Sequence, residues 1–121
     1  MFTLGVGMSS SARPADVREA VGAVMSEAGL VWEDVSLVGT ARHLADDARL
    51  RCLVARVVGF DPGELRAVSV PSVPSPVLMG LSAPPVAEAA ALLAAGPGSR
   101  IVVPRRTGRY VTVAAAVGFR L

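Results

Sequence analysis

Residues 2–39 read FTLGVGMSSSARPADVREAVGAVMSEAGLVWEDVSLVG, and this stretch decides the fold. Its two ends, residues 2–7 and 35–39, are short apolar runs typical of buried strands. Between them Pro14 suits the first position of a helix, and Gly29 suits the end of one. Apolar residues recur between these two with helical spacing, at Val17, Ala20, Val21, Val24 and Ala28. A strand, a helix and a second strand in so short a stretch predict a right-handed parallel β-α-β unit.

The next stretch is predicted to hold a second helix. It begins near Ala45 or Asp46, where the acids complement a helix N-terminus, and it ends at Gly59. Its apolar stripe consists of Leu50, Leu53, Val54 and Val57. Residues 61–64 (DPGE) resemble a capping box that opens a short helical turn.

The last third of the chain predicts one helix and two strands. The helix starts at Pro85 and runs over residues 86–95 to Gly96. The strands cover residues 100–103 and 110–116, with a hairpin-like connection containing Gly108 over residues 104–109. The element order predicts one α/β domain over residues 1–121, with a small mixed or parallel sheet of about four strands and helices on both faces.

Composition excludes several classes of protein. The chain has 121 residues and is 52% hydrophobic, which is enough for a core without disulfides and excludes disorder. All twelve cationic residues are arginines, scattered along a chain of net charge +2 with 4% aromatic residues, so nucleic-acid binding is not indicated. One cysteine and one histidine provide neither a disulfide framework nor a usual zinc site, and no cofactor is expected.

The sequence also predicts a cytoplasmic protein that does not bind membranes. The N-terminus lacks the basic and apolar segments of a signal peptide. Residues 67–99 hold Glu88 as their only charge, but they contain six prolines and cannot form a continuous membrane helix.

The start of the chain holds the first candidate site. Gly5 and Gly7 lie where dinucleotide folds bind pyrophosphate, but position 10, where the third glycine of that fingerprint would stand, is Ser10. Small residues at Ser9 and Ser10, together with Arg13, could still attract an anion to the start of the first helix. Alternatively, the glycines only permit a tight turn.

Three further residues carry possible chemistry. His43 follows the second strand, shortly after Thr40, and is either a general base or a loop histidine bonded to backbone. Cys52 lies beside the predicted apolar stripe and is expected to be a buried, inert thiol. Glu88 falls in the first turn of its helix, where it either caps the helix or serves as a functional carboxylate.

Topology predicts where these residues meet. Loops after parallel strands open on the same sheet edge, and helix N-termini face that edge. We therefore expect one pocket that prefers carboxylates, lined by Gly7, Ser9, Ser10, Arg13, Thr40, His43, Ser75 and Glu88. The alternative is that residues 71–76 pack down and leave no cavity.

The order of the motifs carries a family resemblance. Gly5-x-Gly7, Ala28-Gly29-Leu30 and Thr40 are followed by VGF at residues 58–60, EL at 64–65, PSPV at 74–77, PVAEAAAL at 85–92, VVPR at 102–105 and VTVA at 111–114. This series resembles the cobalamin-biosynthesis family that comprises CobE and the C-terminal domain of CbiG, over about residues 3–116.

The resemblance implies a place in the corrin-ring pathway around ring contraction. Full-length CbiG-like proteins are associated with opening the lactone of cobalt-precorrin-5A and releasing acetaldehyde. The implied partners are a precorrin intermediate and other enzymes of the pathway. Such intermediates carry many carboxylates around a flat apolar ring, which arginines, helix N-termini and an apolar rim such as residues 70–79 would suit.

Three hypotheses follow. The first is a non-catalytic corrinoid-binding protein, because charged positions of the family are changed here, with Leu44 and Arg105 in place of lysines and Asp47 in place of a glutamate. The second is a lactone hydrolase with His43 as base, Glu88 or Asp47 as acid or orienting group, and amides near residues 9–11 as oxyanion donors. The third is a small anion- or nucleotide-binding module that depends on the glycine turn.

Overall fold

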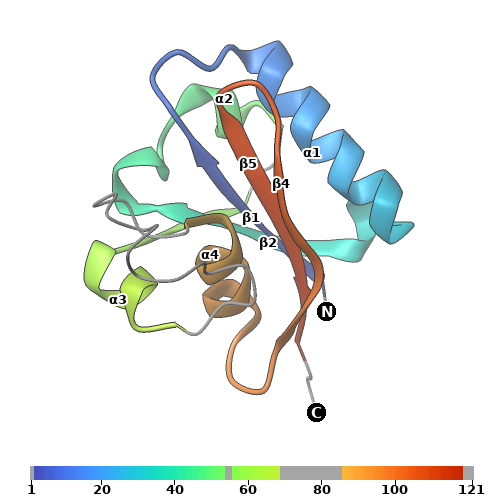
Figure 1. Ribbon diagram of the computed structural model, residues 1–121, viewed down its shortest axis with the longest axis vertical. Coiled ribbons are helices and arrows are strands. Elements are labelled where there is room, and N and C mark those ends of the chain that lie inside the picture. The colour runs from blue at the N-terminus through green and yellow to red at the C-terminus, as the bar shows by residue number, and fades with distance from the viewer. Residues whose placement is uncertain (1, 54–55, 69–85, 119–121) are drawn as a thin grey trace.

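A computed structural model describes residues 2–53, 56–68 and 86–118 of the chain. They form a five-stranded mixed sheet in the order β3-β2-β1-β5-β4 (Figure 1). Three strands are parallel: β1 (Phe2–Met8), β2 (Val35–Ala41) and β3 (Val57–Phe60). Strand β5 (Val111–Val117) runs antiparallel to β1, and β4 (Arg100–Thr107) runs antiparallel to β5. The predicted α/β class is confirmed, with one strand more than expected.

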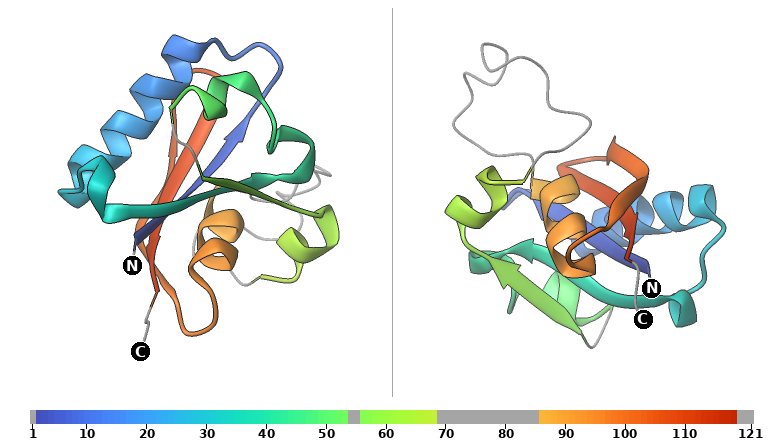
Figure 2. Two further views of the ribbon diagram at one scale, coloured as in Figure 1. Left: turned by 180° about the vertical axis from the view of Figure 1, so that it is seen from behind. Right: turned by 90° about the horizontal axis from the view of Figure 1, so that it is seen from below.

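Helices cover both faces of the sheet, as predicted (Figure 2). Helix α1 (Pro14–Ala28) and the short α2 (Ala48–Arg51) lie on one face. Helix α4 (Val86–Ala95) and the short α3 (Pro62–Arg66) lie on the other. None of the helices in the described part of the chain is long and apolar enough to cross a membrane.

Helix α1 buries the predicted apolar stripe. Val17, Val21 and Val24 pack with Leu4 and Val6 of β1 in the larger hydrophobic core. Each fully buried side chain of this size contributes roughly 1.5–3 kcal/mol. The helix ends at Gly29 in the left-handed conformation, φ 70°, as the sequence indicates.

Helix α4 lies close to the sheet because both surfaces are built from small residues. A Cβ atom added to Gly5 would overlap the carbonyl oxygen of Ala87, and one added to Gly39 would lie 2.5 Å from that of Ala90. The hydroxyl of Thr3 donates a hydrogen bond to the carbonyl oxygen of Ala91, 2.7 Å away, on the same face. The alanine-rich helix and the strand glycines therefore form one packing unit.

The prediction of a second helix between residues 45 and 59 is wrong for most of these residues. Helix α2 covers only Ala48–Arg51, and Val57–Phe60 form strand β3, paired in parallel with β2. A short apolar run fits a strand as well as a helix, and tertiary pairing with β2 decides between them. Cys52 follows α2 and is exposed, so the expectation of a buried thiol is wrong as well.

Two turn predictions also fail. Gly5 and Gly7 lie inside β1, which continues to Met8, so they form no turn. Strand β4 continues to Thr107, so the connection to β5 is three residues long rather than residues 104–109. In both places ladder pairing with β5 extends the strand through residues that are ordinarily turn or breaker signals.

Candidate functional site

The candidate site is the edge of the sheet where β1 and β2 end. We call it the carboxyl edge and define it as residues 8–13, 41–49, 86–88 and 105–111. Figure 1 shows the loop after β1, helix α2 and the β4–β5 turn together at the top of the molecule. The first turn of α4 reaches the same edge, because a Cβ atom on Gly7 would lie 3.3 Å from Cβ of Val86. Of the four segments predicted to meet here, those at residues 7–13, 40–43 and the start of the Glu88 helix lie at this edge, and residues 71–76 lie outside the described residues.

Arg49 holds the loop after β1 in place, a role that no sequence pattern predicted. One guanidinium nitrogen donates to the carbonyl oxygens of Ser9 and Ala12, at 3.0 and 2.7 Å. The other two nitrogens contact both carboxylate oxygens of Asp47, at 2.8 and 2.7 Å. This hydrogen-bonded ion pair lowers the pKa of Asp47 to about 2. Asp47 also accepts the Arg49 backbone N–H and caps α2, so it is a structural residue here.

Arg13 is the N-cap residue that precedes α1 at this edge, and its side chain points largely into solvent. Its backbone N–H donates to Asp16, 3.0 Å away, and its guanidinium lies 3.5 Å from the same carboxylate. The first of these bonds is the main cause of the lowered pKa of Asp16. The Arg13 side chain is 70% exposed, which leaves it accessible to a ligand.

Thr40 is engaged within the sheet. Its buried hydroxyl donates to the carbonyl oxygen of Val6, 2.7 Å away on the neighbouring strand. Gly5 is similarly covered by the backbone of α4. Ser9 and Ser10 are exposed in the loop, and the Ser9 hydroxyl accepts the Ser11 N–H at 3.2 Å. Ser75 and the rest of the proline-serine segment lie outside the described residues.

Glu88 is fully buried, and its carboxylate accepts a hydrogen bond from the backbone of strand β4. The register of β4 against β5 shifts between Val103 and Arg106, which marks a bulge at Pro104 and Arg105. A bulge leaves a backbone donor without its partner in the ladder, and a Glu88 oxygen accepts the Arg105 N–H at 3.1 Å. The carboxylate therefore stabilises the bulge by accepting the Arg105 N–H. The position of Glu88 in the first turn of its helix did not predict this hydrogen bond.

His43 and Glu88 do not form a catalytic pair in this geometry. His43 is exposed in the short 3₁₀ helix that follows β2, while Glu88 is held by β4. Three strand spacings, about 14 Å in total, separate β2 from β4 in the sheet. Within the described part of the chain, no carboxylate forms a hydrogen bond with His43.

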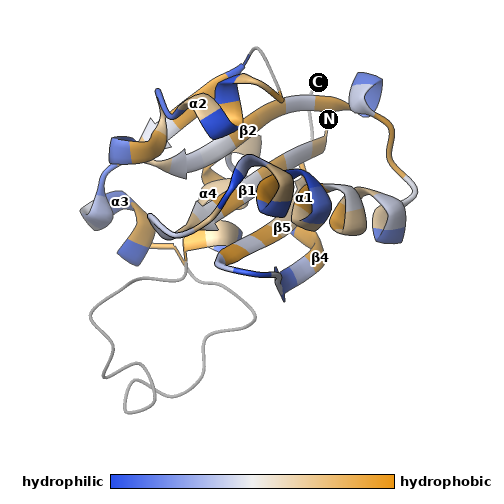
Figure 3. Cartoon of the chain, turned by 90° about the horizontal axis from the view of Figure 1, so that it is seen from above, coloured by the Kyte–Doolittle hydropathy of each residue, from blue (hydrophilic) through white to orange (hydrophobic). Residues whose placement is uncertain are grey.

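Six arginines lie in three segments of the carboxyl edge. They are Arg13, Arg42, Arg49, the neighbouring pair Arg105 and Arg106, and Arg109. Arg42 and Arg106 form exposed ion pairs with Asp61 and Glu27, which raises the pKa of Arg106 and lowers that of Glu27. Among the described residues, Arg105 and Arg109 have no carboxylate within 4.0 Å. Figure 3 shows the hydrophilic residues at α2, at the start of α1 and at the end of the β4–β5 hairpin.

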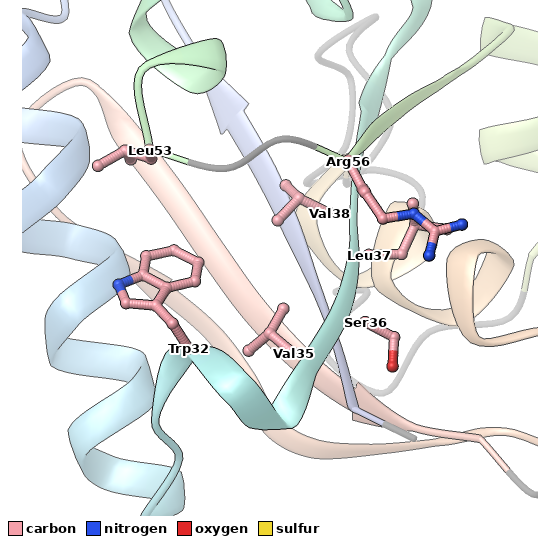
Figure 4. A pocket seen from close by; sticks show the side chains of 7 residues that line it. All are labelled: Trp32, Val35, Ser36, Leu37, Val38, Leu53 and Arg56. Carbon is pink, nitrogen blue, oxygen red and sulfur yellow. The ribbon is translucent and has the colours of Figure 1, made fainter.

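The described cavities are small or lie away from this edge. One of about 230 Å³ lies between α1 and the β4–β5 hairpin and is lined by Asp16, Glu19, Arg106 and Arg109 among others. Another, of about 270 Å³, lies around the start of β2, with Trp32, Val35 and Leu53 on one side of the strand and Arg56 on the other (Figure 4). A third, of about 410 Å³, is lined by apolar and small residues of α4 and the loop after it. No group of three potential metal ligands occurs among residues 2–53, 56–68 and 86–118.

Comparisons with known proteins agree on one family. The family model described as "Cobalamin synthesis G C-terminus" matches residues 2–116. The crystal structure of the cobalamin biosynthesis protein chiG from Agrobacterium tumefaciens is similar at 30% identity and a TM-score of 0.72, covering 99% of this chain and 100% of that one. No curated protein matches the chain.

Two more distant structures share the fold. CobE, a protein from the cobalamin (vitamin B12) biosynthetic pathway, is 21% identical with a TM-score of 0.79, and the match covers 96% of this chain and 89% of that one. A cobalamin biosynthesis protein G homolog from Sulfolobus solfataricus is 21% identical with a TM-score of 0.74. That match covers 95% of this chain but only 36% of the larger protein.

Proposed function

The chain belongs to the cobalamin synthesis G C-terminus family, and on this basis we propose that it binds a polycarboxylate corrin intermediate, without itself catalysing a reaction. The binding surface in this proposal is the carboxyl edge. The observation that carries it is that six arginines from three separate segments lie at one edge of the sheet. We further propose that residues 1–121 act as a single domain.

The charge of the edge suits a ligand with several carboxylates. Arg105 and Arg109 have no carboxylate within 4.0 Å in the described part of the chain, and Arg13 and Arg42 are 70% and 68% exposed in their ion pairs. One exposed ion pair contributes about 1 kcal/mol or less, so a single carboxylate would be held weakly. A rigid ring with carboxylates around its rim would form several such pairs at once.

The geometry favours binding over lactone hydrolysis. A hydrolase needs a base and an orienting or acidic group within reach of one substrate bond. His43 follows β2, whereas Glu88 accepts the Arg105 amide on β4 and Asp47 is engaged by Arg49. The anion- or nucleotide-binding alternative loses the glycine turn on which it depended, because Gly5 and Gly7 lie within β1.

A titration tests the proposal. The full chain would be titrated with cobyrinic acid, a corrin with free peripheral carboxylates, and binding followed by the absorbance of the corrin. We expect saturable binding that weakens with salt, and a several-fold rise in Kd for Arg13→Ala and Arg109→Ala. Arg100→Ala is the matched control, because Arg100 starts β4 at the opposite edge of the sheet. Absence of binding, or an equal effect of Arg100→Ala, would contradict the proposal.

A second assay separates binding from hydrolysis. The wild-type chain would be added to a reconstituted lactone-opening reaction, with His43→Ala in parallel. We expect the chain alone to give no turnover. Turnover that His43→Ala abolishes would favour the hydrolase instead.

A further inference from the structure

The β4–β5 turn contains a residue in a backbone conformation that its side chain disfavours. Tyr110 has φ 62°, the only positive φ of a non-glycine residue in the described part of the chain. It occupies the position in a three-residue hairpin loop where glycine is usual, and a bulky side chain there costs of order 1–3 kcal/mol. Glycine would adopt the same backbone with less strain.

The backbone of Tyr110 has a clear structural role, but its ring does not. The Tyr110 carbonyl oxygen accepts the Ser9 N–H at 3.0 Å, and next to it the Gly108 N–H donates to Val111 at 2.7 Å. These bonds tie the hairpin to the loop after β1 and need no particular side chain at position 110. The residue itself is 52% exposed, so core packing does not account for the ring.

The surroundings of the ring point to a planar anion. The Arg109 guanidinium carbon lies 5.8 Å from the ring centroid, within the range of a cation–π contact. An exposed aromatic ring with one guanidinium over it suits a flat apolar ring system that carries carboxylates at its rim.

We propose that Tyr110 is the stacking platform of the carboxyl edge, with Arg109 beside it pairing with a carboxylate on the ligand rim. This inference rests on the proposed binding of a polycarboxylate corrin and adds the residue that would recognise its ring. Tyr110 is then specificity-determining, because it separates planar polycarboxylates from other anions that the arginines would attract.

The test uses substitutions that distinguish the role of the Tyr110 ring from the role of its backbone conformation. Tyr110→Gly and Tyr110→Asn both tolerate positive φ, and Tyr110→Phe keeps the ring. Trp32→Ala is the control, because Trp32 is also an exposed aromatic residue but precedes β2 at the opposite edge. Each full-length variant would be titrated with uroporphyrin I, a planar octacarboxylate, and with cobyrinic acid, and its melting temperature measured.

We expect Tyr110→Gly and Tyr110→Asn to raise the Kd for uroporphyrin at least about fivefold without lowering the melting temperature. Tyr110→Phe and Trp32→Ala should stay within about twofold of wild type. Wild-type affinity in Tyr110→Gly, or an equal loss in Trp32→Ala, would overturn the role of Tyr110 while leaving the proposed function intact. A wild-type chain that binds neither probe would overturn both.

Discussion

Gly5 of β1 and Gly39 of β2 are register partners in the parallel pair, and both lie against the backbone of α4. The carbonyl oxygens of Ala87 and Ala90 occupy the space that their side chains would need. Because the first turn of the same helix reaches the carboxyl edge, this glycine pair also sets where that edge lies relative to α4.

Gly5→Ala should therefore destabilise the fold strongly. The added methyl group would meet backbone rather than a flexible side chain, and overpacking of this kind costs about 1–3 kcal/mol or more. Gly22→Ala on α1 is the matched control, since nothing lies within 4 Å of its added Cβ, and it should stabilise by up to about 1 kcal/mol. Urea unfolding of the two variants measures both effects, and equal stability would contradict the packing argument.

Thr40→Val should lower the free energy of unfolding, whereas Thr40→Ser, which keeps a hydroxyl, should retain most of the wild-type stability. The hydroxyl donates to the Val6 carbonyl oxygen within the sheet, and losing a buried hydrogen bond of this type costs about 1–3 kcal/mol. The free energy of unfolding and the Kd for cobyrinic acid would be measured on both variants. Should Thr40→Val weaken binding while leaving stability unchanged, its hydroxyl would instead contact the ligand.

Asp47 should make stability depend on pH in the acid range. Its pKa is lowered from 3.8 to about 2 by Arg49, so the stabilisation is complete above about pH 4 and is lost as pH falls toward 2. The difference in unfolding free energy between wild type and Asp47→Asn should therefore shrink over this interval. Asp46→Asn is the control, because the Asp46 side chain is 95% exposed in its pair with Arg51. If the difference in unfolding free energy between wild type and Asp47→Asn stayed constant between pH 5 and pH 2, the Asp47–Arg49 pair would not be the cause of the pH dependence.

Glu88→Ala should destabilise by about 1–3 kcal/mol, because the Arg105 amide at the bulge loses its acceptor. Glu88→Gln keeps a carbonyl oxygen that can accept the same bond and should cost less. Hydrogen exchange at the Arg105 amide would report the loss directly, with faster exchange expected in Glu88→Ala. Unchanged exchange would mean that Glu88 does not hold the bulge.

Local sequence patterns predicted the parts of the fold that depend on local physics. The stripe from Val17 to Ala28, the stop at Gly29 and the alanine-rich helix over residues 86–95 are all present. Strand β3 was missed because Leu50, Leu53 and Val57 happen to continue a helical spacing, and only pairing with β2 shows that residues 57–60 are a strand.

The candidate site was harder to predict because its contacts join distant segments. Arg49 reaches the carbonyl oxygens of Ser9 and Ala12, and no spacing within α2 indicates those partners. Tyr110 was predicted as the first residue of the last strand, whereas it is the last residue of the three-residue turn between β4 and β5. Its positive φ, however, is visible only in the structure.

The bulge at Pro104 and Arg105 has a consequence beyond the position of Glu88. Strand β4 is an outer strand of the sheet, and an outer strand with a regular ladder can recruit another chain and begin aggregation. Pro104 has no N–H to offer, the Arg105 N–H is turned to Glu88, and the arginines that follow add charge. The same irregularity that shapes the candidate site therefore disfavours the addition of another strand to the sheet along β4.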